Sequence, residues 1–435
     1  MSVFRPATFR TFNINFFHDL PWLMLLFLML LVPTTYKYLK AGILSLCLTQ
    51  CIFMIALEKN RSLKIHPSVI NWLILMLANG LFFVLRGGFN DAPGALRVLT
   101  VVALWPMVFV FLSQLLVGRE VLEKSVKVCT YVTIAIALYA IYFLLYEAGI
   151  IPQSLYVAID MGQASSIERN WVEFTLNSLA SLLFLVPFLI AGIFVWKDYF
   201  SKKFLRIAWF GVILGTFCVL LSGRRALQLV TGLAPFIFLL FWFLLPKWER
   251  RKSAPALIKI SLIACCSTIV FMLFLFATDF SVVEILISRF SDGFRFTADS
   301  SAIARMRQFL DLTRGWMEAP FFGHGWGSVA KGLIRDPEMP WAYELFYSAA
   351  LFQLGLVGFL IYAAGIGWIY VTGCRIIRQG ALHGAIMLPL LTGMTCFLIA
   401  NSTNPYLGKF DCMWVIFLPV ACINSWLLQK RVLVK

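Results

Sequence analysis

The most regular feature of the sequence is a series of long apolar stretches, separated by short segments that carry most of the charged residues. About 20 apolar residues in a helix are enough to cross the hydrocarbon core of a membrane. The pattern predicts twelve such helices. They lie at 19–35, 41–57, 68–85, 95–117, 126–149, 171–196, 204–221, 226–245, 257–278, 343–373, 383–401 and 410–428.

Composition places the chain among membrane proteins. It is 61% hydrophobic and 13% charged, whereas about a quarter of the residues in a soluble domain are charged. No Ser/Gly linker and no internal repeat divides the sequence, so we predict one polytopic, all-α integral membrane domain over 1–435. The first stretch lacks a small-residue cleavage site and is followed at once by another, which argues against a cleaved signal peptide.

The net charge of +16 could indicate a nucleic-acid partner, but the positions of the charges argue against one. More than half of the 37 Lys and Arg residues fall in the two terminal segments and in the alternate loops that would share their side. By the positive-inside rule, this distribution places both termini in the cytoplasm. We therefore predict membrane lipids as partners of this positive charge, and no nucleic acid.

Cysteine, histidine and aspartate give no indication of a metal site. The ten cysteines form no CxxC pair, and several lie in apolar runs, where a thiol behaves as a small apolar group. The four histidines are too scattered for zinc spacing. Asp292, Asp299 and Asp311 are isolated from one another in the sequence. We expect neither a metal nor a cofactor.

One loop, 279–341, is much longer than the others and would lie on the extracytoplasmic (periplasmic) side, between the ninth and tenth stretches. Its apolar residues recur at helical spacing from Ile303 to Trp316. Ala319-Pro320 should end that helix, and a glycine-rich turn follows at 323–327. Because loops of this length are usually functional, we expect short helices that cover the outer face of the bundle.

Charged residues also stand at the borders of apolar stretches, where they are costly unless they are paired or line a cavity. Arg224 and Arg225 form a very short extracytoplasmic turn, and Glu344 stands at the start of the tenth stretch. Two adjacent guanidinium groups suit bidentate binding of phosphate. Alternatively, the arginines extend to lipid headgroups, and Glu344 is the ion-pair partner of one of them.

The long loop adds three more candidates. Arg289 and Arg305 could extend the positive charge of the arginine turn, and His324 lies within the glycine-rich turn. The alternatives are that the two arginines belong to solvated surfaces and that His324 is a polar turn residue exposed to water.

These residues together resemble the bacterial O-antigen ligase and O-antigen polymerase superfamily. Ser222-Gly223-Arg224-Arg225-Ala226 is similar to its short arginine turn. Arg305, followed by Pro320, Gly323, Gly325 and Gly327, is similar to its loop signature. The helix start from Glu344 to Gly355 and Gly358 resembles the segment that comes next in the family. The resemblance covers roughly 205–365 by motif and the whole chain by hydropathy.

One departure favours the polymerase branch. The family's ligases usually have His where Glu344 stands, and the Tyr343-Glu344 pair is more similar to the polymerases or to related exopolysaccharide polymerases. The turn that contains Asn404, Asn401-Ser-Thr-Asn404-Pro405-Tyr406, also resembles polymerase sequences.

The resemblance implies a GT-C-like, multi-pass glycosyltransferase of the bacterial inner membrane. Such an enzyme polymerises undecaprenyl-diphosphate-linked repeat units into the O-antigen of lipopolysaccharide, or into a related exopolysaccharide. The transfer would be inverting and metal-independent, with lipid-linked glycans as donor and acceptor and a chain-length regulator protein as a further partner.

Residue roles follow from this chemistry. Arg224 and Arg225 would stabilise the departing diphosphate, helped by Arg289 and Arg305, and which member of the adjacent pair is essential stays open. Glu344 would be the general base, with His324 as second choice. Tyr343 and Asn404 are further substrate-binding candidates.

Three other functions are compatible with the same features. One is an O-antigen ligase, which transfers the glycan to the lipid A core. Another is a lipid-linked oligosaccharide flippase, although no two-half symmetry is apparent. A non-catalytic assembly subunit would leave the charged residues at the borders without a role.

Overall fold

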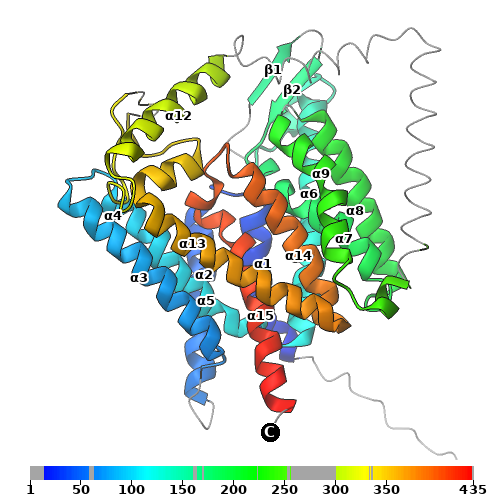
Figure 1. Cartoon of the computed structure of the whole chain (residues 1–435). Helices are drawn as coiled ribbons and strands as arrows, with labels where there is room; N and C mark the ends of the chain where they lie inside the picture. The colour runs from blue at the N-terminus through cyan, green and yellow to red at the C-terminus, as the bar shows by residue number, and fades with distance from the viewer. Residues whose placement is uncertain are drawn as a thin grey trace, which may run out of the picture.

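Helices make up nearly all the regular structure of the computed structural model (Figure 1). The structure describes residues 14–57, 63–159, 164–168, 171–222, 224–251, 255, 300–332, 334 and 337–433. The elements are α1 (Ile14–Leu31), α2 (Lys37–Leu57), α3 (Pro67–Phe89), α4 (Ala95–Leu99), η1 (Thr100–Leu104), α5 (Trp105–Leu112), η2 (Ser113–Leu116), α6 (Arg119–Glu147), η3 (Gln153–Leu155), β1 (Ala164–Glu168), β2 (Trp171–Thr175), α7 (Leu179–Val195), α8 (Lys202–Leu221), α9 (Arg225–Trp242), α12 (Ser300–Glu318), α13 (Phe346–Gln379), α14 (Ala381–Ala400), η4 (Tyr406–Gly408), η5 (Phe410–Cys412) and α15 (Trp414–Leu433).

The helices have the lengths that a membrane requires. Among the described residues, eight helices are long and apolar enough to span a bilayer, and three shorter apolar helices accompany them. Each predicted stretch in the described part overlaps one of these helices, whereas 257–278 lies outside the described residues. The chain therefore has the architecture of a multi-pass membrane protein, and the count of twelve stays a prediction.

The outward-facing side chains of several helices are large and apolar. Phe53 on α2 is 62% exposed, and Phe236 and Leu240 on α9 are 67% and 70% exposed. A soluble protein rarely presents such a continuous apolar surface, whereas lipid chains solvate it well. The packing thus agrees with the membrane character indicated by composition.

Helices α7 and α14 form the centre of the bundle and are buried along most of their lengths. The two backbones approach closely where α14 has a glycine. A Cβ added at Gly393 would lie 2.9 Å from the carbonyl oxygen of Phe184. Small residues allow this kind of close packing between membrane helices. Beyond the end of α7, the Trp196 indole donates to the Ala385 carbonyl oxygen at 3.0 Å.

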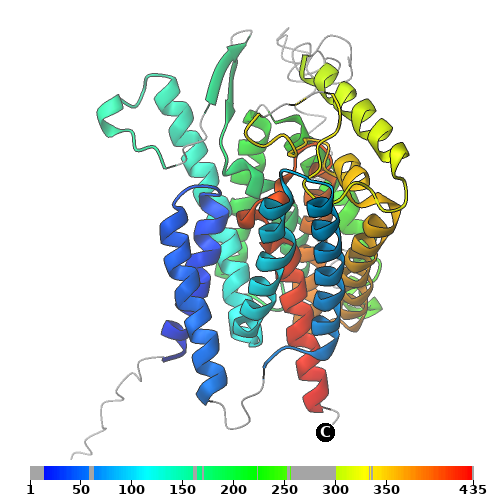
Figure 2. The ribbon, with the colours of Figure 1, turned by 90° about the vertical axis from the view of Figure 1, so that its left-hand side faces the viewer.

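The bundle has two distinct ends. Figures 1 and 2 show α12 and the β1–β2 hairpin at one end and the C-terminus at the other. We call the first end the α12 face. It is formed by the described residues of the connections 32–36, 90–94, 148–178, 222–224, 300–345 and 401–413. The predicted helix of the long loop is confirmed as α12, and it ends at Glu318, just before Ala319-Pro320.

The predicted helix at 171–196 was wrong in its first part. Residues Trp171–Thr175 form strand β2, which pairs antiparallel with Ala164–Glu168, and α7 begins only at Leu179. Val172 and Phe174 alternate with Glu173 and Thr175, which is the period of a strand. The sequence prediction merged this short alternating segment with the long apolar run that follows it, and so assigned both to one helix. Apart from this hairpin, the described part of the chain is helical, as the sequence predicted.

Candidate functional site

An ion pair joins the long loop to the start of α13. The Arg305 guanidinium, on α12, donates through Nε to Oε2 of Glu344 at 3.0 Å. The Arg305 side chain is 35% exposed and that of Glu344 is 14% exposed. The sequence suggested an ion pair between Glu344 and the arginine turn, which stays a prediction; the structure shows a pair between Glu344 and Arg305 of the loop.

A buried amide fixes the position of Glu344. Gln308, 3% exposed, accepts hydrogen bonds from the backbone N–H groups of Glu344 and Leu345 at 3.0 and 3.1 Å. These N–H groups precede the first residue of α13, where no turn of helix can satisfy them. Gln308 was missed from the sequence. Its spacing of three residues from Arg305 puts both side chains on one face of a helix, but that spacing does not identify the partners of Gln308.

Arg224 approaches the same point from another helix. It is the residue just before α9, and its guanidinium lies close enough to the Tyr406 phenol to lower the pKa of that phenol. Burial raises the pKa of Tyr406, the neighbouring Arg224 partly opposes that rise, and the charge of Glu344 adds to it. We call Arg224, Arg305, Glu344 and Tyr406 the arginine–glutamate cluster. These four residues come from three connections at the α12 face.

The two adjacent arginines are placed differently. Arg224 has extended backbone angles and is half-buried, whereas Arg225 is the first residue of α9 and is exposed. Because Arg224 is half-buried and lies near the Tyr406 phenol, we favour Arg224 as the functional member. The role of either arginine in catalysis stays a prediction.

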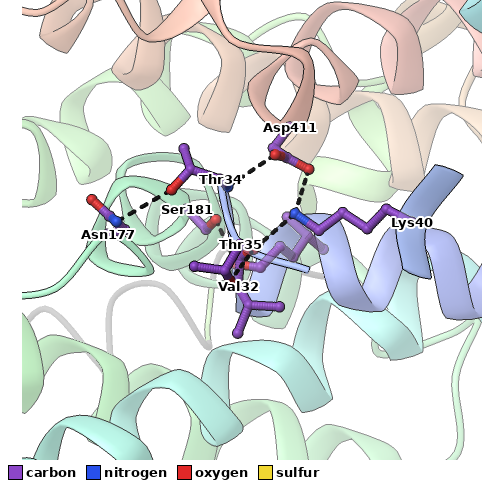
Figure 3. Close-up of polar contacts among 8 residues, drawn as sticks. Val32, Thr34, Thr35, Lys40, Asn177, Ser181 and Asp411 are labelled. Atoms are coloured by element: carbon purple, nitrogen blue, oxygen red, sulfur yellow. Dashed lines mark hydrogen bonds and ion pairs between the residues drawn. The ribbon is translucent and has the colours of Figure 1, made fainter. Parts of the chain in front are cut away.

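A buried ion pair holds the connection that carries Tyr406 (Figure 3). Asp411 accepts from Lys40 Nζ at 2.7 Å and from the Thr34 N–H at 2.9 Å. Lys40, only 4% exposed, also donates to the Val32 carbonyl oxygen at 2.8 Å. Tyr406 lies five positions before Asp411, so this pair fixes its connection to the turn between α1 and α2. Sequence reasoning missed both charged residues.

The glycine-rich turn is shaped by close backbone contacts. Gly323, Gly325 and Gly327 have φ angles of +53°, +93° and +83°, a region that favours glycine. A Cβ at Gly325 would collide with the backbone of Gly87, and a Cβ at Gly327 with that of Gly94. No side chain fits at these positions unless the backbone moves, which explains the spacing of the glycines.

This turn fills a break in α13. Gly355, with φ +63°, interrupts the helix. The N–H groups of His324 and Gly325 donate to the Phe352 and Gln353 carbonyl oxygens at 3.1 and 2.7 Å. In the opposite direction, the N–H groups of Leu356 and Val357 donate to the Pro320 and Phe321 carbonyl oxygens at 2.8 and 3.0 Å. We call residues 320–327 together with the Gly355 break the glycine clasp. It holds the end of α12 against α13.

The remaining site candidates have structural contacts. His324 Nε2 lies 2.8 Å from the Gly315 carbonyl oxygen, and its ring lies against Phe352 with 4.8 Å between centroids. Tyr343 is 5% exposed, and its phenol accepts from the Ala330 N–H at 2.6 Å. Burial raises the pKa of this phenol.

The backbone oxygen of Asn404 accepts from the Tyr406 N–H at 2.8 Å, so Asn404 lies in the same connection as the cluster. Arg289 lies outside the described residues. Substrate contacts by Arg289, His324, Tyr343 and Asn404 stay predictions.

Within the described part of the chain, no three His, Cys, Asp or Glu side chains lie close enough to hold a metal. The expectation of a metal-independent reaction stays a prediction. The chain matches no protein-family profile and no curated protein.

Proposed function

We propose that this chain is a membrane glycosyltransferase that polymerises undecaprenyl-diphosphate-linked repeat units into O-antigen or a related surface polysaccharide. The observation that carries this proposal is the meeting of Arg224, Arg305 and Glu344 at one end of an apolar helical bundle. A diphosphate on a long apolar tail needs cationic groups at the edge of a membrane. The attacking sugar needs a base beside them.

The two arginines would hold the diphosphate of the donor. Arg305 donates to Glu344 through Nε and is 35% exposed, so its terminal nitrogens can bind a phosphate while this bond persists. Arg224, which lies near the Tyr406 phenol, would bind the same diphosphate. Positive charge fixed in advance at the leaving group stabilises the negative charge that develops there.

Glu344 would act as the general base. A hydroxyl of the acceptor sugar attacks the anomeric carbon of the donor and forms the new glycosidic bond. The bond between that carbon and the phosphate oxygen breaks, its electron pair leaves with undecaprenyl diphosphate, and Glu344 takes the hydroxyl proton. Attack opposite to the leaving group inverts the anomeric centre, and no step needs a metal.

The proposed reaction takes place on one particular side of the membrane. The α12 face would be extracytoplasmic in the bacterial inner membrane, with both termini cytoplasmic, because the positive charges favour that orientation. Nucleotide sugars are absent there, so lipid-linked glycans are the available donors and acceptors. A chain-length regulator protein would be a further partner.

The deciding experiment is to incubate purified protein with a single lipid-linked repeat unit and to resolve the products by length. A ladder of longer glycans on undecaprenyl diphosphate is the expected result. Transfer only to an added lipid A core would identify a ligase. Movement of the lipid-linked glycan across a vesicle membrane without a new glycosidic bond would identify a flippase. Glu344→Gln is the matched negative control.

A further inference from the structure

At the end of the bundle opposite the α12 face, three cations line one cavity of about 430 Å³. Arg375 and Arg378 come from the last turns of α13, and Lys430 comes from the end of α15. Arg375 and Arg378 are three positions apart, so they lie on one face of their helix. None of the described residues that line the cavity is acidic.

The charge of this cavity is uncompensated within the described part of the chain. There, none of the three cations has a carboxylate within ion-pair distance. Three exposed cations that line one cavity without a counterion give it a positive potential, which attracts anions. The hydroxyls of Ser68 and Thr372 also line the cavity and would add hydrogen bonds to a bound anion.

Tryptophans place the cavity at the boundary between hydrocarbon and water. Trp368 and Trp426 both line it. The Trp426 indole donates to Gln379 Oε1 at 3.1 Å, and Lys430 Nζ lies 5.4 Å from the centroid of the Trp426 ring. Tryptophan is enriched at the depth of the lipid headgroups, where one end of the ring is wet and the other apolar. An anion that binds here therefore lies at headgroup depth.

We propose that this cavity binds the phosphate headgroup of an anionic phospholipid from the adjacent leaflet. A cavity of this size falls in the usual range for small-molecule sites. The phosphate would lie among Arg375, Arg378 and Lys430. The acyl chains of the lipid would extend from the cavity along Leu427, which lines it, and lie against the apolar outer surface of α13. Anionic lipid would thereby join the end of α13 to the end of α15. This inference does not depend on the proposed glycosyl transfer.

The test compares three proteins purified in detergent and stripped of lipid. One is the wild type, and the second carries Arg375→Gln, Arg378→Gln and Lys430→Gln. The matched control carries Lys202→Gln, Lys203→Gln and Arg206→Gln, which removes three exposed cations at the start of α8 that do not line the cavity. The melting temperature is measured as phosphatidylglycerol, phosphatidylcholine or inorganic phosphate is added.

Phosphatidylglycerol should raise the melting temperature of the wild type and of the control variant. The cavity variant should need at least about tenfold more of this lipid for half of the effect. Lys430→Gln alone should weaken the response in the same direction, which keeps the test valid if the triple variant does not fold.

Three results would overturn the proposal. One is an equal response of the cavity variant and the wild type. Another is an equal effect of phosphatidylcholine, which would show that negative charge is not recognised. The third is an equal effect of inorganic phosphate, which would assign the cavity to a soluble anion.

Discussion

Arg305 and Glu344, 39 positions apart in the chain, form an ion pair 3.0 Å long between α12 and the start of α13. This pair links the long loop to the bundle and places one guanidinium and one carboxylate at the same point. Within this pair, Glu344 has two possible roles in the proposed reaction: it can be the proton acceptor, or it can serve only to orient Arg305. The two roles predict different activities for the variants Glu344→Gln and Arg305→Gln.

If Glu344 is the base, Glu344→Gln should lower the rate of glycan elongation by about 10²–10⁴-fold. The amide keeps the shape of the side chain but cannot take a proton at neutral pH. Arg305→Gln should still elongate measurably, because Glu344 can still act as the base, but it should need a higher donor concentration to reach half of its maximal rate. The readout is the initial rate of ladder formation at several donor concentrations. Glu318→Gln, at the exposed end of α12, is the control and should elongate normally. Equal losses in the Glu344 and Arg305 variants would favour a purely orienting role for Glu344.

Arg224 and Arg225 give a comparison between neighbours. Arg224→Gln should lower elongation by about 10²–10³-fold, the usual effect of removing one group that stabilises developing charge. Arg225→Gln should retain most of the activity, because Arg225 is exposed on the first turn of α9, whereas Arg224 is half-buried near the Tyr406 phenol. Both proteins should be present in the membrane at wild-type amounts. The opposite order of activities would reassign the functional arginine.

The raised pKa of Tyr406 leads to a prediction about how the elongation rate depends on pH. Burial raises the pKa of this phenol above its ordinary value of 10, so the group is protonated at neutral and mildly alkaline pH and cannot be the base. Tyr406→Phe should therefore lower the elongation rate through poorer positioning of Arg224. The shape of the pH profile between pH 6 and 9 should be unchanged. Loss of an alkaline limb in this variant would show that Tyr406 does titrate during the reaction.

The sequence alone predicted most of the helices, because a span depends on the length and apolarity of one continuous segment. It also singled out Arg224 and Glu344, since charges at the border of an apolar stretch are costly wherever they occur. It could not find Gln308, whose hydrogen bonds cross to residues 36 and 37 positions away. The Lys40–Asp411 pair, separated by 371 positions, was equally hidden. Such partners are defined by how helices pack, which no local pattern records.

The glycine clasp predicts that substitution of Gly325 by alanine destabilises the protein more than the same substitution of Gly232. Gly325→Ala should destabilise the protein by at least about 1–3 kcal/mol, because alanine is strained at positive φ and its Cβ would collide with the Gly87 backbone. Gly232→Ala is the control. Gly232 lies within α9, with no atom within 4 Å of an added Cβ, so this change should be neutral or stabilise by about 0.5–1 kcal/mol. Thermal unfolding in detergent measures both. Equal stability of the two variants would show that the close contacts of the glycine clasp do not contribute to the free energy of unfolding.

The Lys40–Asp411 pair should be the most sensitive ionic contact among those described above. Its side chains are 4% and 11% exposed, so Asp411→Ala would leave a buried ammonium without its counterion, at a cost of about 3–5 kcal/mol. Replacing both partners, as Lys40→Met with Asp411→Leu, should restore much of that loss because no buried charge remains. Arg119→Gln is the control. It removes an ion pair with Glu123 in which the arginine side chain is 64% exposed, and it should cost only about 0.3–0.5 kcal/mol.

The same pair connects stability to the site, because Asp411 fixes the connection that carries Tyr406. Asp411→Asn keeps the acceptor for the Thr34 N–H but loses the charge, so it should lower both the melting temperature and the elongation rate. The rescued Lys40→Met, Asp411→Leu protein separates these two effects. If the pair positions Tyr406 and Arg224, this double variant should melt near the wild type yet elongate more slowly. Full activity at restored stability would limit the pair to a structural role.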